Sequence, residues 1–335
     1  MSENKIEVLL FGLGAIGSFY AFILRNSPRV RLTVVARSNY AAVKEHGILL
    51  KSANHGEHRF HPDHVISSLS DLLISPGASP VFDYVVCTNK AIDIDSVARS
   101  LAPAITAAKT TIVIIQNGVG NEAPFRRLYD SGNEILSCVT WVGANQPTPG
   151  TVTHTTSEAT QLGLFQPLTP RAQTLLEAFI GLLNGSDNPH PTPVTPLSPE
   201  DLQRTRWEKL MWNCAWNTLT TLTGLDCQAW LLSSEDALPL TKRLMHEVVA
   251  VARAEGVELR GELVDEQITK MQGLGPVRTS MQTDREMGRR MEVEVIIGTV
   301  VKGARRVGVE IPVLETVYAL IRAVDGLGGG RMEKM

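Results

Sequence analysis

VLLFGLGAIGSF, residues 8–19, decides how this chain folds. A short apolar run enters the glycines Gly12, Gly14 and Gly17 in GxGxxG spacing, and a helical pattern follows at once. In that context the first glycine permits a tight turn, the second lets a pyrophosphate approach the backbone, and the third lets helix and strand pack closely. Because the helix N-terminus then faces the phosphates, the stretch predicts dinucleotide binding. A plain tight turn is the alternative.

Short apolar runs alternate with helical patterns through the first half of the chain. We predict strands over residues 6–11, 31–36, 81–88, 111–116 and 134–142. We predict helices over residues 16–25, 93–101, 121–129 and 170–183. This alternation indicates a parallel sheet with helices on its faces. Residues 151–156 and 159–164 predict a small antiparallel pair.

A proline-rich segment, NPHPTPVTPLSPED at 188–201, is the best candidate for a domain boundary. Ser198 followed by Pro199 and two acids is the pattern of a helix start. From there to about Asp325 the periodicity is helical. We therefore expect an α/β fold with a Rossmann-type parallel-sheet domain and an all-helical C-terminal domain. The expected bounds are 1–196 for the first domain, 197–328 for the second and 329–335 for a flexible tail.

Composition argues against several classes of function. The formal net charge is −3 over 335 residues, so nothing points to nucleic acid or to an anionic membrane. The N-terminus lacks a signal-peptide layout, and no segment is long enough to span a bilayer. The cysteines at 87, 138, 214 and 227 show no CxxC spacing, which indicates reduced, buried thiols. We expect a cytoplasmic protein.

Four histidines stand three residues apart in HGEHRFHPDH, residues 55–64. This spacing hints at a metal site. Gly56 and Pro62 would interrupt a helix, however, and in a strand a three-residue spacing alternates faces. We therefore expect a solvated hairpin and no metal.

Polar residues follow three further predicted strands, where ligands of such sheets bind. Arg37 stands twenty positions after Gly17, where an acid would bind the ribose hydroxyls of NAD; an arginine suits the 2′-phosphate of NADP(H). A surface arginine, or one stacked on the adenine, is the alternative. Lys90 and Asn117 follow the next two strands, although a solvated lysine and an Asn-Gly turn are common there.

The second half carries two sets of polar residues within apolar helical patterns. Lys209, Asn213 and Asn217 in WEKLMWNCAWNTLTTL are four residues apart and lie along one stripe of a helix. The stripe is either an active-site wall or an ordinary polar face. Ser280 stands near the start of TSMQTDREMGRRMEVEVIIG, and Glu292 opens its apolar run. Glu292 either holds a substrate hydroxyl or complements a helix dipole.

Over nearly its full length the chain resembles the ketopantoate reductase (2-dehydropantoate 2-reductase) family. The resemblance rests on GLGAIG, Arg37, Asn89-Lys90, QNGVG around Asn117, WEKLxxNxxxN and the segment from Ser280 to Glu292. It implies NADPH as hydride donor, a small keto substrate and a place in pantothenate biosynthesis. It is also compatible with a homodimer formed through the helical domain.

Carried onto this chain, the resemblance implies a role for each polar residue. The implied catalytic residues are Lys209, the general acid that protonates the ketone oxygen, and Glu292, which holds the substrate hydroxyl. The implied substrate-binding residues are Asn117, Asn213, Asn217 and Ser280. The implied cofactor-binding residues are Gly12, Leu13, Gly14, Ala15, Ile16, Gly17, Arg37, Lys90 and Asn117.

Two departures from the family pattern concern the substrate more than the reaction. Thr218 stands where relatives often carry proline or a small residue, and Cys227 falls near the place of another substrate-contacting asparagine. A related reductase of another 2-keto acid or ketone, such as an intermediate of secondary metabolism, is therefore an alternative. A β-hydroxyacid dehydrogenase is a neighbouring version of it, although Glu292 and the Ser280 segment favour the ketopantoate reductase type. A non-catalytic NADP(H)-binding sensor is a further one, although a sensor does not need a general acid.

Overall fold

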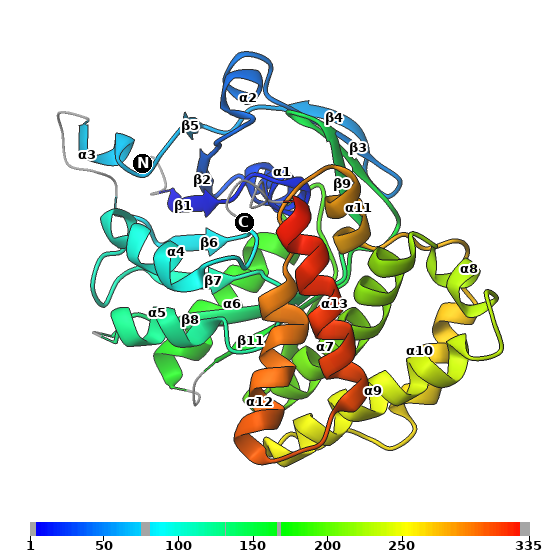
Figure 1. The fold of residues 1–335 in the computed structure, drawn as a ribbon. Helices are drawn as coiled ribbons and strands as arrows, with labels where there is room; N and C mark the ends of the chain where they lie inside the picture. Colours follow the sequence, from blue (N-terminus) through cyan, green and yellow to red (C-terminus); the bar gives the residue numbers. More distant parts are fainter. Residues whose placement is uncertain (1–4, 75–80, 131, 166–168, 329–335) are drawn as a thin grey trace. The chain divides into compact units, whose positions relative to one another are not determined.

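The computed structural model describes residues 5–74, 81–130, 132–165 and 169–328 (Figure 1). The chain divides into two units, each of which is described by itself. The first comprises Met1–Gln116 and Gly120–Leu202, and the second comprises Asn117–Val119 and Gln203–Met335. The predicted flexible tail, 329–335, lies outside the described residues. In the described ranges no helix combines the length and apolar character needed to cross a bilayer.

The main sheet of the first unit contains, among the described residues, eight strands in the order β12-β11-β8-β7-β6-β1-β2-β5. Their bounds are β1 Ile6–Phe11, β2 Val30–Val35, β5 His64–Ile66, β6 Tyr84–Cys87, β7 Thr111–Ile114, β8 Ile135–Thr140, β11 Thr160–Leu164 and β12 Val194–Leu197. Neighbours run parallel except β8 and β11, which are antiparallel. The five strands predicted for this sheet are present, and the predicted parallel-sheet fold is confirmed.

Alternation along the strands builds a hydrophobic core on each face of this sheet. In β1, Val8 and Leu10 belong to the core that includes α1 and α6, whereas Leu9 belongs to the core that includes α4 and α5. These helices span α1 Ala15–Asn26, α4 Ile94–Ser100, α5 Glu122–Leu128 and α6 Pro170–Asn184. Short helices that the sequence did not predict include α2 Tyr40–His46 and α3 Asp71–Ile74.

A second sheet covers α1 from its other side (Figure 1). Its described strands, in spatial order, are β4 Gly56–Phe60, β3 Ile48–Ser52, β10 Thr151–His154 and β9 Ala144–Thr148. Every residue of α1 from 17 to 24 is buried, as expected for a helix packed on several sides. Tyr20 on α1 bonds with the hydroxyls of Thr140 and Thr160, at 2.8 Å each, and so fixes α1 to β8 and β11.

The predicted antiparallel pair of 151–156 with 159–164 is wrong. Strand β10 pairs with β3 and β9 in the second sheet, whereas β11 pairs with β8 in the main sheet. Strand β10 is half-buried and β11 is almost fully buried, but the burial pattern along a strand does not identify its partner.

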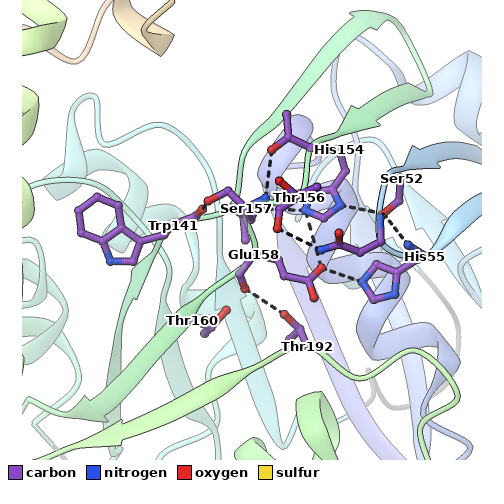
Figure 2. A network of polar contacts seen from close by, with 12 residues as sticks. Ser52, His55, Trp141, His154, Thr156, Ser157, Glu158, Thr160 and Thr192 are labelled. Atoms are coloured by element: carbon purple, nitrogen blue, oxygen red, sulfur yellow. Dashed lines mark hydrogen bonds and ion pairs between the residues drawn. The ribbon is translucent and has the colours of Figure 1, made fainter. Parts of the chain in front are cut away.

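The predicted hairpin at the histidine-rich stretch is present as β3 and β4, but it is not simply solvated. The centroid of the His55 ring lies 5.7 Å from that of Phe22 on α1. His55 Nε2 donates to Glu158 Oε2 at 2.9 Å (Figure 2). His154 bonds with Ser52 at 2.8 Å across β10 and β3 (Figure 2). The described residues contain no group of His, Cys, Asp and Glu arranged to hold a metal ion.

The second unit is helical, and no strand follows Leu197 in the described residues. Its elements are α7 Pro199–Thr223, α8 Cys227–Leu231, α9 Ala237–Ala254, α10 Leu263–Gln272, α11 Ser280–Glu286, the π-helical turn Glu294–Gly298, α12 Thr299–Val307 and α13 Pro312–Gly328. Helix α9 packs against α8, α10, α12 and α13 (Figure 1). The backbone N–H of Asp201 donates to Ser198 Oγ at 3.1 Å, so the predicted cap of α7 is confirmed.

His154 and His190, which pack against Phe19 and Phe22 of α1, should make the protein less stable in mild acid. Burial lowers the pKa of His154 and of His190, and neighbouring histidines add to both effects. Below the usual value of 6.5 the unfolded chain then binds more protons than the folded one, so stability is lost as the pH falls from about 6.5 toward the lowered pKa values. We expect the urea midpoint to drop between about pH 7 and pH 5, and to drop less in His154→Gln/His190→Gln. The exposed His64→Gln serves as control, and parallel slopes in all three proteins would contradict the account.

Candidate functional site

The glycine turn after β1 has the geometry that the motif predicts. Gly12 has φ +105°, and a Cβ there would lie 2.3 Å from the backbone nitrogen of Asn89. A Cβ on Gly17 would lie 2.1 Å from the Gly12 carbonyl oxygen, so only glycine lets α1 approach the turn this closely. Gly14 differs from both, because a Cβ there would meet nothing within 4 Å among the described residues. The turn is tight on two sides and leaves room beside Gly14.

The N-terminus of α1 is left available for an anion. Gly14 is the N-cap and has no side chain to bond the first amides, and the first turn carries no acidic residue. Four backbone N–H groups at a helix start need partners, and the helix dipole favours a negative charge there. Together with the space beside Gly14, these features fit the pyrophosphate of a dinucleotide.

Two polar side chains that sequence reasoning did not select brace this loop, and a third braces the neighbouring turn after β6. Thr88 Oγ1 donates to the Gly12 carbonyl at 2.8 Å, and Asn39 Nδ2 donates to the Leu13 carbonyl at 2.7 Å. Gln116 Nε2 donates to the Asn89 carbonyl at 2.9 Å. Each stands within a few positions of the end of a strand, which is the signal that could have identified them.

The two cationic cofactor candidates, Arg37 and Lys90, are exposed at the carboxyl ends of β2 and β6. In the described chain the Arg37 side chain makes no hydrogen bond or ion pair, so its guanidinium is available to a ligand. The carbonyl of Lys90 accepts from Ile92 N at 2.8 Å and from Asn89 Nδ2 at 2.9 Å, which closes a turn after β6.

In the second unit, the asparagines of the predicted stripe are buried rather than solvated. Asn213 and Asn217 on α7 are 6% and 3% exposed, and the Nδ2 atom of each has no hydrogen-bond partner among the described residues. Lys209 precedes them on the same stripe and is half-buried. Leaving a buried donor unpaired costs about 1–3 kcal/mol, and Trp216 Nε1 and Thr221 Oγ1 of the same helix are also buried without a partner among the described residues.

Asn117 and Glu292 are brought together within this same unit, although 175 residues separate them in the chain. Asn117 Nδ2 donates to Glu292 Oε2 at 2.9 Å, and both side chains are half-buried. The π-helical turn begins two residues after Glu292, and such turns are frequent at functional sites. A charge-assisted bond of this kind fixes the orientation of the carboxylate.

Ser280 and Cys227 have different surroundings. Ser280 is exposed as the first residue of α11, whereas the preceding Thr279 caps the helix and bonds with Thr220 at 2.8 Å. Cys227 is buried, and burial raises the pKa of its thiol to about 12, so the thiol stays neutral. All four cysteines are free and buried, as predicted.

Comparisons with known proteins place both parts of the chain in one family. The family described as "Ketopantoate reductase PanE/ApbA" matches residues 8–167, and "Ketopantoate reductase PanE/ApbA C terminal" matches residues 201–325. The crystal structure of 2-dehydropantoate 2-reductase from Methylococcus capsulatus is 32% identical, with 96% of this chain and 98% of that chain covered and a TM-score of 0.79. An uncharacterized protein of Saccharomyces cerevisiae is 28% identical, with 95% of this chain and 93% of that protein covered.

A more distant structure, D-mandelate dehydrogenase with NADH and anilino(oxo)acetate, is 19% identical and has a TM-score of 0.80. The alignment covers 96% of this chain and 99% of that one. At this identity the likeness concerns the fold alone.

The contrast between Gly14 and Gly17 gives a matched pair of variants. Gly17→Ala should lower the free energy of unfolding by about 1–3 kcal/mol, because its Cβ would overlap the Gly12 carbonyl, even though alanine favours helix. Gly14→Ala should leave the melting temperature nearly unchanged and weaken binding of a nicotinamide dinucleotide by about tenfold, because its Cβ would enter the space left for the pyrophosphate. Thermal unfolding and fluorescence titration measure the two effects, and an unstable Gly14→Ala protein would contradict this assignment.

Proposed function

The chain belongs to the ketopantoate reductase family, and we propose that it reduces a 2-keto acid with NADPH, with ketopantoate as the first candidate substrate. The coarser activity, that of an oxidoreductase with a nicotinamide cofactor, follows from the family. The observation that carries the finer proposal is the pair of buried, unpartnered amide nitrogens of Asn213 and Asn217, on the stripe that begins with Lys209.

The first unit supplies the cofactor-binding residues in this proposal. The amides at the start of α1, around Gly14, hold the pyrophosphate, and Gly12 and Gly17 keep the turn in shape. The Arg37 guanidinium binds the 2′-phosphate, since it is exposed at the end of β2 and has no partner among the described residues. Lys90 adds a second positive charge at the carboxyl ends of the strands.

Lys209 acts as the general acid. The nicotinamide, when bound, supplies a hydride to the carbonyl carbon of the substrate. Negative charge then develops on the carbonyl oxygen, where the Lys209 ammonium stabilises it and donates the proton. A half-buried lysine is suited to this role because its charge is less screened than a fully solvated one.

Four further residues hold the substrate in this proposal. The Nδ2 atoms of Asn213 and Asn217 donate to the carboxylate and hydroxyl oxygens without adding charge. Glu292 accepts a hydrogen bond from the substrate hydroxyl while Asn117 fixes the carboxylate at 2.9 Å. Ser280, exposed at the start of α11, is the remaining donor.

A different 2-keto acid is the second candidate substrate. Cys227 is buried, and its thiol stays neutral, so this position offers no strong hydrogen bond to a substrate. If this position adjoins the substrate, the pocket favours a keto acid with a less polar side chain. The reaction would be unchanged.

Lys209→Ala tests the proposed chemistry. Loss of the general acid should lower kcat by roughly 10²-fold or more while NADPH still binds. Steady-state rates and NADPH fluorescence measure the two, and Lys242→Ala, at an exposed ion pair with Asp265, serves as control. A Lys209→Ala enzyme with normal kcat would remove Lys209 from the mechanism.

Arg37→Ala tests the choice of cofactor. We expect the Kd for NADPH to rise by about tenfold or more and the Kd for NADH to change little, because only NADPH carries the 2′-phosphate. Arg31→Ala is the matched control, an exposed arginine of β2 that pairs with Glu7 at 2.7 Å. Equal weakening of both cofactors would show that Arg37 does not read the phosphate.

A further inference from the structure

Arg206 is a buried cation on α7, one helical turn before Lys209. Arg206 is only 3% exposed. Such burial is uncommon for an arginine unless hydrogen bonds or ion pairs satisfy its charge. One guanidinium nitrogen, Nη1, donates to the carbonyl oxygen of Gly118 at 2.9 Å. This bond connects the helix that carries Lys209 with the segment that carries Asn117.

Gly118 is held on a second side by the π-helical turn. Its φ is +100°, and a Cβ there would lie 2.4 Å from Val295 Cγ2 and 2.8 Å from the Val295 carbonyl oxygen. The backbone of Gly118 therefore approaches Val295 more closely than any side chain would allow. The Arg206 bond and the Val295 contact together fix both the position and the rotation of this peptide.

Asn117 precedes Gly118 directly, so its side chain depends on the same peptide. Its Nδ2 donates to Glu292 Oε2 at 2.9 Å, and Glu292 lies three residues before Val295. Hydrogen bonds weaken steeply as their angle departs from linear, and site residues need placement to within about 0.5 Å. A shift of the Gly118 peptide would therefore loosen the bond between Asn117 and Glu292.

We propose that Arg206 is a positioning residue, which holds the Gly118 carbonyl so that Asn117 keeps the Glu292 carboxylate aimed at the substrate. The proposal rests on the proposed reductase function for its effect on rate, whereas its structural part concerns Asn117 and Glu292 alone. Arg206 acts through Asn117, so its effect on turnover requires the Asn117 side chain.

A double-mutant cycle tests this dependence. Arg206→Met keeps an apolar stem and removes the donors, and we expect it to lower kcat/KM by about tenfold. In an Asn117→Ala background the same change should lower kcat/KM by less than about twofold, because the side chain that Arg206 positions is gone. Losses that multiply in the double variant would overturn the proposal.

A second measurement reads the structural part without turnover. In protein labelled with ¹⁵N-asparagine, the Asn117 side-chain amide is identified by its loss in Asn117→Ala. Arg206→Met should move this signal toward the position of a free amide. Arg253→Met is the matched control, since Arg253 also donates to a loop carbonyl, that of Leu259, at 3.1 and 2.6 Å. An Asn117 signal that stays in place in Arg206→Met would overturn the proposal.

The two readouts separate the possible failures. If the wild-type protein reduces no 2-keto acid, the proposed function fails, and the amide signal alone decides the role of Arg206. If Arg206→Met does not fold, Arg206→Lys keeps a charged donor on a shorter reach and enters the same cycle and the same spectrum. Its expected effects are smaller but have the same pattern, and a multiplicative loss or a fixed signal would again overturn the proposal.

Discussion

The close approach of α1 to the turn after β1 is the constraint on which the first unit depends. Because Gly17 faces the Gly12 carbonyl with no room for a methyl group, strand, turn and helix hold one relative position. Burial of α1 between two sheets then secures that position, since a fully buried Phe19 or Phe22 contributes about 1.5–3 kcal/mol. Packing in the core of the first unit thus holds the amide groups at the start of α1 in place before a ligand binds.

Buried polar atoms without hydrogen-bond partners lower the stability of α7 in the second unit. In the described chain, α7 buries four side-chain atoms without partners: the amide nitrogens of Asn213 and Asn217, Trp216 Nε1 and Thr221 Oγ1. The threonines at 218, 220 and 223 instead bond back to carbonyls of their own helix. Glu292 is treated differently, because its carboxylate is already fixed by Asn117. Donors left open for a ligand and an acceptor that is already oriented are both typical of a preorganised site.

The sequence predicted those features that depend on local pattern. The strand at residues 6–11 has the predicted bounds, because its apolar run ends at Gly12, where the chain turns. The helix cap at Ser198 could also be predicted, because it bonds to Asp201 only three residues away. Pairing could not be predicted, because Thr160 meets Thr140 and His154 meets Ser52 through contacts distant in sequence. Asn117 and Glu292 were named from motifs, whereas Arg206 was not, because nothing local distinguishes a buried arginine from a surface one on a helix.

The most direct test of the central claim is the initial rate of NADPH oxidation with ketopantoate, run beside a panel of other 2-keto acids. The account predicts saturable oxidation with at least one of them, ketopantoate first. Oxidation with another member of the panel alone would keep the reaction and assign a different substrate. A protein that binds NADPH but oxidises it with no member of the panel would contradict the account.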